Sequence, residues 1–294
     1  MKLLVIDGNS IMNRAFYGIR VLTNKKGMPT NALTGFLNIF LKLMKEEAPD
    51  RIAVAFDLHA PTFRHKMYAD YKGTRHAMPD ELRAQMPIIK QILTALGVAI
   101  VEKEGYEADD IIGTLSHAAE SQGGECTIST GDRDSFQLIT DKVTVRLASN
   151  KEDIIYTPAK IAEVYGVTPR EMLEVKTLMG DSSDNIPGIP GVGEKTETKM
   201  VVQFGSIENA HEHLEEVKPN KAKESLREHY DMAQLSKELA TINTDSPLEF
   251  SYEKAKVENP YTPEAYELCK RLEFKNMLNR FDPVTAADSS MELE

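Results

Sequence analysis

The stretches that decide the fold of this 294-residue chain are Leu3-Leu4-Val5-Ile6-Asp7 and Ile52-Ala53-Val54-Ala55-Phe56-Asp57. Each is a short apolar run that ends in a carboxylate. A third stretch, Thr127-Ile128-Ser129-Thr130-Gly131, leads in the same way into Asp132. Short apolar runs are typical of strands that are buried on both faces of a sheet. The three stretches therefore predict strands of a parallel sheet, each ending in an acid.

Strand and helix patterns alternate through the first half of the chain. We predict strands at 2–7, 52–57, 98–103, 125–130 and 143–147, and helices at 33–47, 80–96 and 108–121. This order indicates an α/β fold in which a parallel sheet is flanked by helices on both faces. Ligands of such sheets bind beyond the carboxyl ends of the strands. Asp7, Asp57 and Asp132 all stand at those ends, so we expect them to share one site.

Nine acidic residues form the candidate site. Carboxylates that gather in one place repel each other unless a cation neutralises them. Oxygen-only clusters without nearby Cys or His suit hard divalent ions such as Mg²⁺ or Mn²⁺. The pattern therefore predicts a site with several metal ions that acts on phosphate groups. The nine candidate ligands are Asp7, Asp57, Glu107, Asp109, Asp110, Asp132, Asp134, Asp181 and Asp184.

Each acidic motif also has a simpler interpretation. Glu107, Asp109 and Asp110 open a predicted helix, where one acid would suffice to cap the N-terminus. The pairs Asp132/Asp134 and Asp181/Asp184 precede turns, and Asp7-Gly8-Asn9-Ser10 on its own reads as a strand-end turn. The metal hypothesis therefore rests on all the acidic motifs taken together, because the predicted fold would bring these positions to one edge of the sheet.

Composition constrains the partners of the protein. The net charge is −11, yet with the nine candidate ligands set aside 37 of the 46 acids remain against 35 bases. A basic face for nucleic acid is therefore compatible with this charge. No apolar run is long enough to span a membrane. Cys126 and Cys269 lie far apart, which favours a reducing cytosol over a disulfide framework.

Residues 58–79 interrupt the alternating pattern with interleaved bases and aromatics. Phe63, Arg64, Lys66, Tyr71 and Lys72 belong to this insertion. Bases that follow phosphates and aromatics that stack on nucleobases are typical of proteins that bind single strands. The simpler interpretation is a solvated surface loop.

The second half of the chain is predicted to be helical. We expect helices near 158–165, 169–179, 196–204, 221–229, 231–241 and 262–272. The segment Gly188-Ile-Pro-Gly191-Val-Gly193-Glu194-Lys195-Thr196 is not a P-loop, because Glu194 interrupts the Gly-Lys junction and no strand precedes it. A helix–hairpin–helix fits better, since glycines let backbone amides approach a phosphate. A plain turn between two helices is the alternative.

Taken together, these motifs resemble the 5′-nuclease (flap endonuclease) family. The likeness runs from Met1 to about Phe281. The motifs that carry it are Asp7-Gly-Asn, Phe56-Asp57, Phe63-Arg-His65, Tyr71-Lys-Gly73, Gly105-Tyr-Glu-Ala-Asp-Asp110, Asp132-x-Asp134, Gly180-Asp-Ser-Ser-Asp-Asn-Ile-Pro-Gly188 and Gly191-Val-Gly-Glu-Lys-Thr196.

The resemblance implies a PIN-like core at 1–157 with a helical arch at about 58–85. It also implies a helical region at 158–283, with a helix–hairpin–helix at about 184–205. Residues 284–294 are expected to be a disordered tail. The ligands of the family's tighter metal position are matched by Asp7, Asp57, Glu107, Asp109 and Asp132. Those of its second position are matched by Asp134, Asp181 and Asp184, and Asp110 supports the cluster.

The resemblance also implies roles for other residues. Lys72 and Arg75 match bases of the arch near the scissile phosphate, and Asp7 and Asp132 are carried over with them as catalytic. Glu197 departs from the family, which usually has a small residue there. The expected DNA contacts are Arg14, Arg64, Lys66, Tyr71, Lys72, Arg75, Gly188, Gly191, Gly193, Lys195 and Thr196.

The implied activity is hydrolysis of phosphodiesters by two-metal catalysis, with two or three Mg²⁺ or Mn²⁺ ions and a K⁺ ion at the hairpin. Expected substrates are DNA with a 5′ flap, a nick or a single-stranded 5′ end, and RNA primers on DNA. We expect a monomer in the bacterial cytoplasm, without membrane contact. In 294 residues no polymerase palm is expected.

Two other classes of function remain as alternatives. One is a module that binds DNA junctions without catalysis, although the negative charge of nine carboxylates would weaken the binding of DNA by such a module. A phosphatase with Asp7 as nucleophile is the other. That class expects a second Asp where Asn9 stands.

Overall fold

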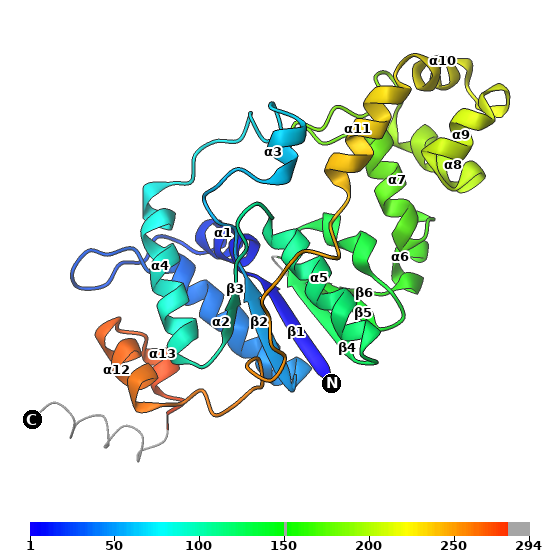
Figure 1. The fold of residues 1–294 in the computed structure, drawn as a ribbon. Helices are drawn as coiled ribbons and strands as arrows, with labels where there is room; N and C mark the ends of the chain where they lie inside the picture. The colour runs from blue at the N-terminus through cyan, green and yellow to red at the C-terminus, as the bar shows by residue number, and fades with distance from the viewer. Residues whose placement is uncertain (150–151, 282–294) are drawn as a thin grey trace, which may run out of the picture.

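The computed structural model describes residues 1–149 and 152–281, so the predicted tail at 284–294 lies outside the described residues. Its centre is a six-stranded sheet with the order β3-β2-β1-β4-β5-β6 (Figure 1). Every neighbouring pair is parallel except β5 and β6. The strands are β1 (Lys2–Asp7), β2 (Arg51–Ala55), β3 (Ala99–Val101), β4 (Glu125–Thr130), β5 (Val143–Leu147) and β6 (Ile154–Tyr156). The predicted parallel sheet is confirmed.

The apolar composition of β1 follows from its position in the middle of the sheet. Leu3 and Val5 point to one face and pack in the same cluster as Ile111 of α5 (Ala108–Ser121). Leu4 and Ile6 point to the other face and pack with residues of α2 (Asn31–Glu47). Because helices cover both faces, alternate side chains are buried in both directions and no polar alternation is present.

Helices flank the sheet on its two faces. Figure 1 shows α1, α2 and α4 grouped on one side of the strands and α5 on the other. The helices and short turns of the first half are α1 (Gly8–Gly18), α2, α3 (Phe63–Met67), α4 (Asp80–Ala95), α5 and the 3₁₀ helix η1 (Arg133–Leu138). Within the predicted arch segment, α3 is followed by a series of turns.

The second half of the chain is helical, as predicted. Its elements are α6 (Pro158–Tyr165), α7 (Pro169–Met179), α8 (Glu194–Phe204), α9 (Ile207–Glu212), η2 (Leu214–Glu216), α10 (Asn220–Glu228), α11 (Tyr230–Ala240), α12 (Pro263–Arg271) and α13 (Lys275–Leu278). The last two helices leave this group and lie beside α4 in Figure 1. There Cys269, Phe274 and Met277 join the core around α2.

Several short elements differ from the sequence-based expectations. Asp7-Gly8-Asn9-Ser10, read as a turn, instead opens α1, because the Asp7 carboxylate accepts the amide of Ser10 as an N-cap. The turn predicted after Asp132 and Asp134 is the 3₁₀ helix η1. Neither α3, α9, α13 nor β6 was expected, and each is six residues or shorter.

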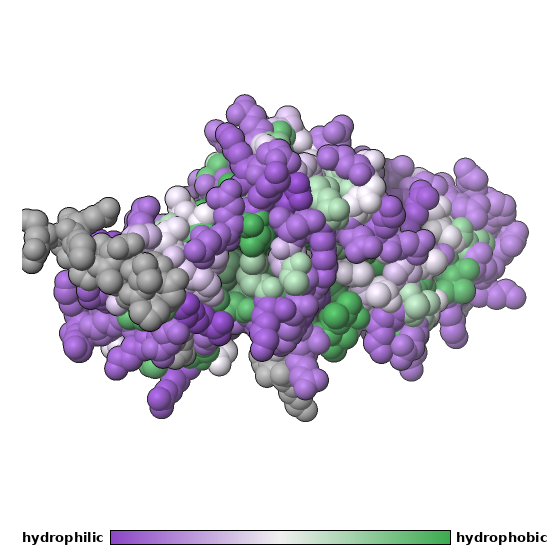
Figure 2. Space-filling view, turned by 90° about the horizontal axis from the view of Figure 1, so that it is seen from below, coloured by the Kyte–Doolittle hydropathy of each residue, from purple (hydrophilic) through white to green (hydrophobic). Residues whose placement is uncertain are grey.

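Hydrophilic residues dominate the face shown in Figure 2, and hydrophobic residues form small separate patches there. No helix among the described residues is both long and apolar enough to cross a membrane.

Two glycines shape the loop between α7 and α8. Gly180 has φ 72° and Gly188 has φ 63°, a conformation that strains residues with a side chain. A Cβ on Gly188 would lie 2.5 Å from the backbone nitrogen of Gly180. Between them, the backbone of Asp181 and that of Ile186 exchange two hydrogen bonds of 2.8 Å. The crossing thus fixes the loop that carries Asp181 and Asp184.

Gly188→Ala is expected to lower the free energy of unfolding by at least about 2 kcal/mol, because the new Cβ collides with backbone that cannot move aside. Gly193→Ala is the matched control. Gly193 has φ −107°, and a Cβ there meets nothing within 4 Å. Urea unfolding of both variants measures the difference. Equal stability of the two would show that the crossing can relax.

Candidate metal centre

Four acids meet at the carboxyl edge of the sheet. Asp7 ends β1, Asp57 follows β2, Asp132 follows β4, and Asp109 lies in the first turn of α5. Each of the first three caps backbone amides at this edge. Asp7 accepts from Ser10, Asp57 from Ala108 at 2.7 Å, and Asp132 from Asp134 at 2.9 Å. The predicted convergence of the strand ends therefore exists in the fold.

Burial, with mutual repulsion added to it, raises the pKa of two acids in this group. Burial raises the pKa of the Asp7 carboxyl to about 7, and the charges of Asp57 and Asp132 add to the rise, against hydrogen bonds from Ser10 and Thr130. Burial also raises the pKa of Asp109 well above its usual range, with further repulsion from Asp132 and Asp7. One Asp109 oxygen is buried without a hydrogen-bond partner. Such a group calls for a proton or a cation.

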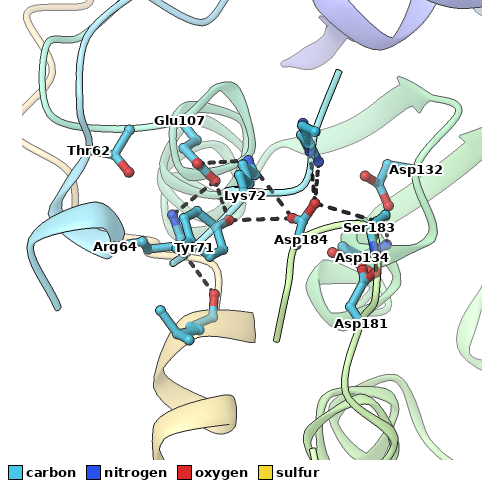
Figure 3. A network of polar contacts seen from close by, with 12 residues as sticks. Thr62, Arg64, Tyr71, Lys72, Glu107, Asp132, Asp134, Asp181, Ser183 and Asp184 are labelled. Atoms are coloured by element: carbon cyan, nitrogen blue, oxygen red, sulfur yellow. Dashed lines mark hydrogen bonds and ion pairs between the residues drawn. The ribbon is translucent and has the colours of Figure 1, made fainter. Parts of the chain in front are cut away.

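A second group of acids comes from η1 and the loop after α7. Asp134, Asp181 and Asp184 each place one carboxylate oxygen within 4.8 Å of the other two. Figure 3 shows these side chains next to Asp132. A cleft of about 680 Å³ opens here, lined among others by Asp132, Asp134 and Asp181.

Lys176 is a member of this group that sequence reasoning missed. Its ammonium is ion-paired with Asp134 and lies 2.9 Å from Asp181. Burial alone would raise the pKa of Asp181, but bonds from Lys176 and Ser183 lower it to about 2. Burial and the charge of Asp132 raise the pKa of Asp134 to about 6, although Lys176 opposes the rise. No motif marks Lys176, which reads as an ordinary base at a helix end.

Lys72 and Arg75 lie directly over the carboxylates. The Lys72 ammonium is 2.7 Å from Glu107 (Figure 3). Arg75 Nε is 3.0 Å from Asp184. The backbone reinforces these pairs, since the Lys72 amide donates to the Asp184 carbonyl at 2.8 Å. The side chain of Asn185 in turn donates to the Asp70 carbonyl at 2.8 Å. Both bases also line a cleft of about 420 Å³ beside Asp57 and Glu107.

Tyr71 is turned inward, away from any position for stacking on an exposed base. It is 3% exposed, and its hydroxyl donates to Glu107 at 3.0 Å. Its neighbours fit a packing role, while the expected DNA contact does not fit this position.

Arg64 and Asp110 form a buried pair that corrects two expectations. Arg64 is 2% exposed and makes two bonds to Asp110, of 2.7 and 2.8 Å. Asp110 also accepts the amides of Glu107 and Asn243 and is fully buried. Its oxygens are thus occupied, and it is not placed to bind an ion. Arg64 further donates to the carbonyls of Leu239 and Thr241, so it joins α3 to α5 and α11 rather than reaching toward DNA.

The other expected DNA contacts lie in four places. Lys66 is exposed on α3, and Arg14 lies on α1. Gly191, Gly193 and Lys195 are exposed at the start of α8, where Thr196 is half-buried. Gly188 is buried in the crossing with Gly180, so it shapes the loop and cannot itself approach a phosphate.

Two family models match the chain in succession. The 5′-3′ exonuclease N-terminal resolvase-like domain matches residues 2–166, and the 5′-3′ exonuclease C-terminal SAM fold matches residues 167–263. The chain belongs to the 5′-3′ exonuclease family. This agrees with the resemblance seen in its motifs.

Curated relatives and solved structures extend the comparison. The chain is 45% identical to DNA polymerase I of Bacillus subtilis over 296 residues, and 38% identical to the thermostable DNA polymerase I of Thermus filiformis over 280 residues. These alignments cover 100% and 95% of this chain, but 34% and 33% of the relatives. The chain thus spans about a third of the length of the curated relatives it matches.

The solved structures show the same fold. A complex of the bacteriophage T5 D15 flap endonuclease with DNA and metal ions has a TM-score of 0.69 at 18% identity, with 96% of each chain covered. The catalytic core of Rad2 in complex with DNA has a TM-score of 0.61 at 15% identity, covering 95% of this chain and 91% of that one.

Without divalent ions, the charge of Asp7 is expected to make stability depend on pH. The folded Asp7 carboxyl, with a pKa of about 7, keeps a proton that the unfolded one, at 3.8, releases. Stability in EDTA should therefore fall as pH rises between these values, by up to about 4 kcal/mol. Asp7→Asn lacks this loss, so its advantage over wild type should grow between about pH 5 and pH 7.5.

Thermal unfolding in EDTA at several pH values measures this difference, with exposed Asp141→Asn as the control. Saturating Mg²⁺ should restore the stability that the wild type loses at pH 7.5, because an ion that binds only the folded state stabilises that state. Parallel pH curves for wild type and Asp7→Asn would contradict the assignment of Asp7 to a repelling cluster.

Proposed function

We propose that this chain is a structure-specific 5′ nuclease that hydrolyses phosphodiesters at 5′ flaps and nicks in DNA, and in RNA primers paired with DNA, during replication and repair. The observation that supports this most directly is the meeting of acids from three strand ends, the start of α5, η1 and the loop after α7 beside Lys72 and Arg75. Acids that repel each other under two bases suit a reaction that needs both metal ions and a negatively charged substrate.

The residues fit two hard divalent ions, Mg²⁺ or Mn²⁺. All donors are oxygens, one Asp109 oxygen lacks any partner, and three further oxygens lie within 4.8 Å of each other. Asp7, Asp109 and Asp132 would hold one ion, with Asp57 and Glu107 beside it. Asp134, Asp181 and Asp184 would hold the other. When bound, such ions activate a water molecule and stabilise the leaving oxygen.

The side chains over the centre have separate roles. Lys72 would turn from Glu107 to the scissile phosphate and stabilise the charge that develops there. Arg75 presents a planar fork, which matches two phosphate oxygens once it leaves Asp184. Both groups would hold the reacting phosphate over the carboxylates.

The start of α8 would hold the duplex next to the cut. Backbone amides near Gly191 and Gly193, with Lys195, present a site for a phosphate that does not depend on base identity. A K⁺ ion is proposed to assist there. Glu197, the departure from the family, is 1% exposed and lies on the buried face of α8 with Met200 and Val201. Its charge therefore does not face a phosphate at the hairpin.

The comparisons support DNA as the partner. The phage T5 endonuclease and Rad2 structures contain DNA, and the relatives of three times this length carry the name DNA polymerase I. We infer that this chain corresponds to the 5′ nuclease part of such a polymerase and acts as a monomer in the bacterial cytoplasm.

Asp132→Ala is expected to lower the rate of flap cleavage at least about a hundredfold, because it removes one of the carboxylates that would hold the first metal ion. The assay follows a 5′-labelled flap duplex with Mg²⁺ and with EDTA. Asp141→Ala, which removes an exposed acid that belongs to none of the acidic motifs, is the matched control. Tight junction binding without any cut under divalent ions would instead assign the chain to a binding module.

Lys72→Ala is expected to slow single-turnover cleavage at least about a hundredfold while affinity for the flap changes less than about tenfold. The reason is that the ammonium acts on charge that is present only in the transition state. Lys66→Ala, on the exposed side of the same segment, should weaken binding without that loss of rate. Equal losses of rate and affinity for Lys72→Ala would make Lys72 a simple phosphate contact.

A further inference from the structure

The two halves of the acidic centre are neutralised differently. Within the described parts of the chain, no lysine or arginine forms an ion pair with Asp7, Asp109 or Asp132. The half formed by Asp134 and Asp181 already holds a cation, the ammonium of Lys176. Among the described residues, Asp7, Asp109 and Asp132 thus have no ion-paired base, whereas Asp134 and Asp181 share the ammonium of Lys176.

The position of Lys176 is fixed by the helix that carries it. It stands in the last turn of α7, and its carbonyl accepts the Gly180 amide at 2.8 Å, which sets the start of the acidic loop. Its side chain is 13% exposed. A lysine that only complemented the helix dipole would need to lie near the last carbonyls. This ammonium instead bridges carboxylates from two different segments.

The same oxygens cannot serve an ammonium and a divalent ion at once. Lys176 contacts Asp134 and Asp181, two of the three acids whose oxygens lie within 4.8 Å of one another. We propose that Lys176 is a resident counter-ion that a second divalent ion must displace, and that this displacement makes the second metal position the weaker one. The inference rests on the proposed metal centre.

This arrangement has a consequence for the free protein. With the lysine in place, Asp134 and Asp181 remain paired and the loop after α7 keeps its shape without a metal ion. The ammonium would then move aside only when the ion concentration, or a substrate that brings additional negative charge, favours a divalent cation in its place.

The test compares Mn²⁺ binding by three proteins. Bound Mn²⁺ is counted by electron paramagnetic resonance during a titration with MnCl₂ at neutral pH. The wild type should show one tight and one weak class of site. Lys176→Met keeps most of the apolar stem and removes the charge, and it should tighten the weak class at least about tenfold while the tight class changes little.

Lys237 provides a matched control in the same helical region. Its ammonium also bridges two carboxylates, Glu174 at 2.6 Å and Glu208 at 2.8 Å, outside the acidic centre. Lys237→Met should leave both classes of Mn²⁺ site unchanged. An equal change in both variants would show a general effect of lost charge and would overturn the inference.

The other outcomes are also decisive. An unchanged or weakened second class in Lys176→Met would overturn the role of Lys176 while leaving the metal centre intact. If the wild type bound no Mn²⁺, the proposed metal centre itself would be wrong. Should Lys176→Met unfold in EDTA, Lys176→Gln is measured as well. Folding rescued by Mn²⁺ supports the inference, and failure of both variants to fold with Mn²⁺ contradicts it.

Discussion

Repulsion among carboxylates at one edge of the sheet is the constraint on which the rest of the structure depends. The parallel arrangement brings the ends of β1, β2 and β4 together, and each end carries an acid. Buried acids of like charge would each prefer a proton to a negative charge. Three bases form ion pairs with acids of the site, namely Lys72 and Arg75 from one segment and Lys176 from another. The cost of crowding is thus partly offset before any metal ion binds.

The site joins the two halves of the fold. Asp134 follows β4, whereas Asp181 and Asp184 come from the loop after α7 in the helical half. Arg64 strengthens this connection, because one buried guanidinium bonds to Asp110 of α5 and to carbonyls at the end of α11. Replacing either Arg64 or Asp110 by an uncharged residue would leave an unpaired charge in the interior, which costs far more stability than the loss of an exposed ion pair.

Much of the fold was predictable from the chain because its elements are long or strongly apolar. The strands at 2–7, 125–130 and 143–147 and the helices at 108–121, 158–165 and 169–179 have the predicted bounds. Short elements such as β6 and α13 were missed because they offer too few residues for a period to be read. The 11-residue helix α1 was missed as well, because Asp7-Gly8-Asn9-Ser10 was read as a strand-end turn. The carboxylates could be found because acids that follow apolar strands are unusual. The position of Lys176 in the site and the buried position of Arg64 could not be predicted, because tertiary contacts alone decide where the charged group of a long side chain lies.

Besides the pairing of Arg75 with Asp184, three hydrogen bonds that each use at least one main-chain atom join the segment 70–75 to the loop 181–185. The Lys72 amide binds the Asp184 carbonyl, and the carbonyls of Asp70 and Ser182 accept bonds from Asn185 and Thr74. Because every one of these contacts ends on a backbone atom, all of them depend on the length of the backbone in both segments. An insertion or deletion in either segment would shift the register of both, so the two loops must keep matched lengths as the sequence diverges.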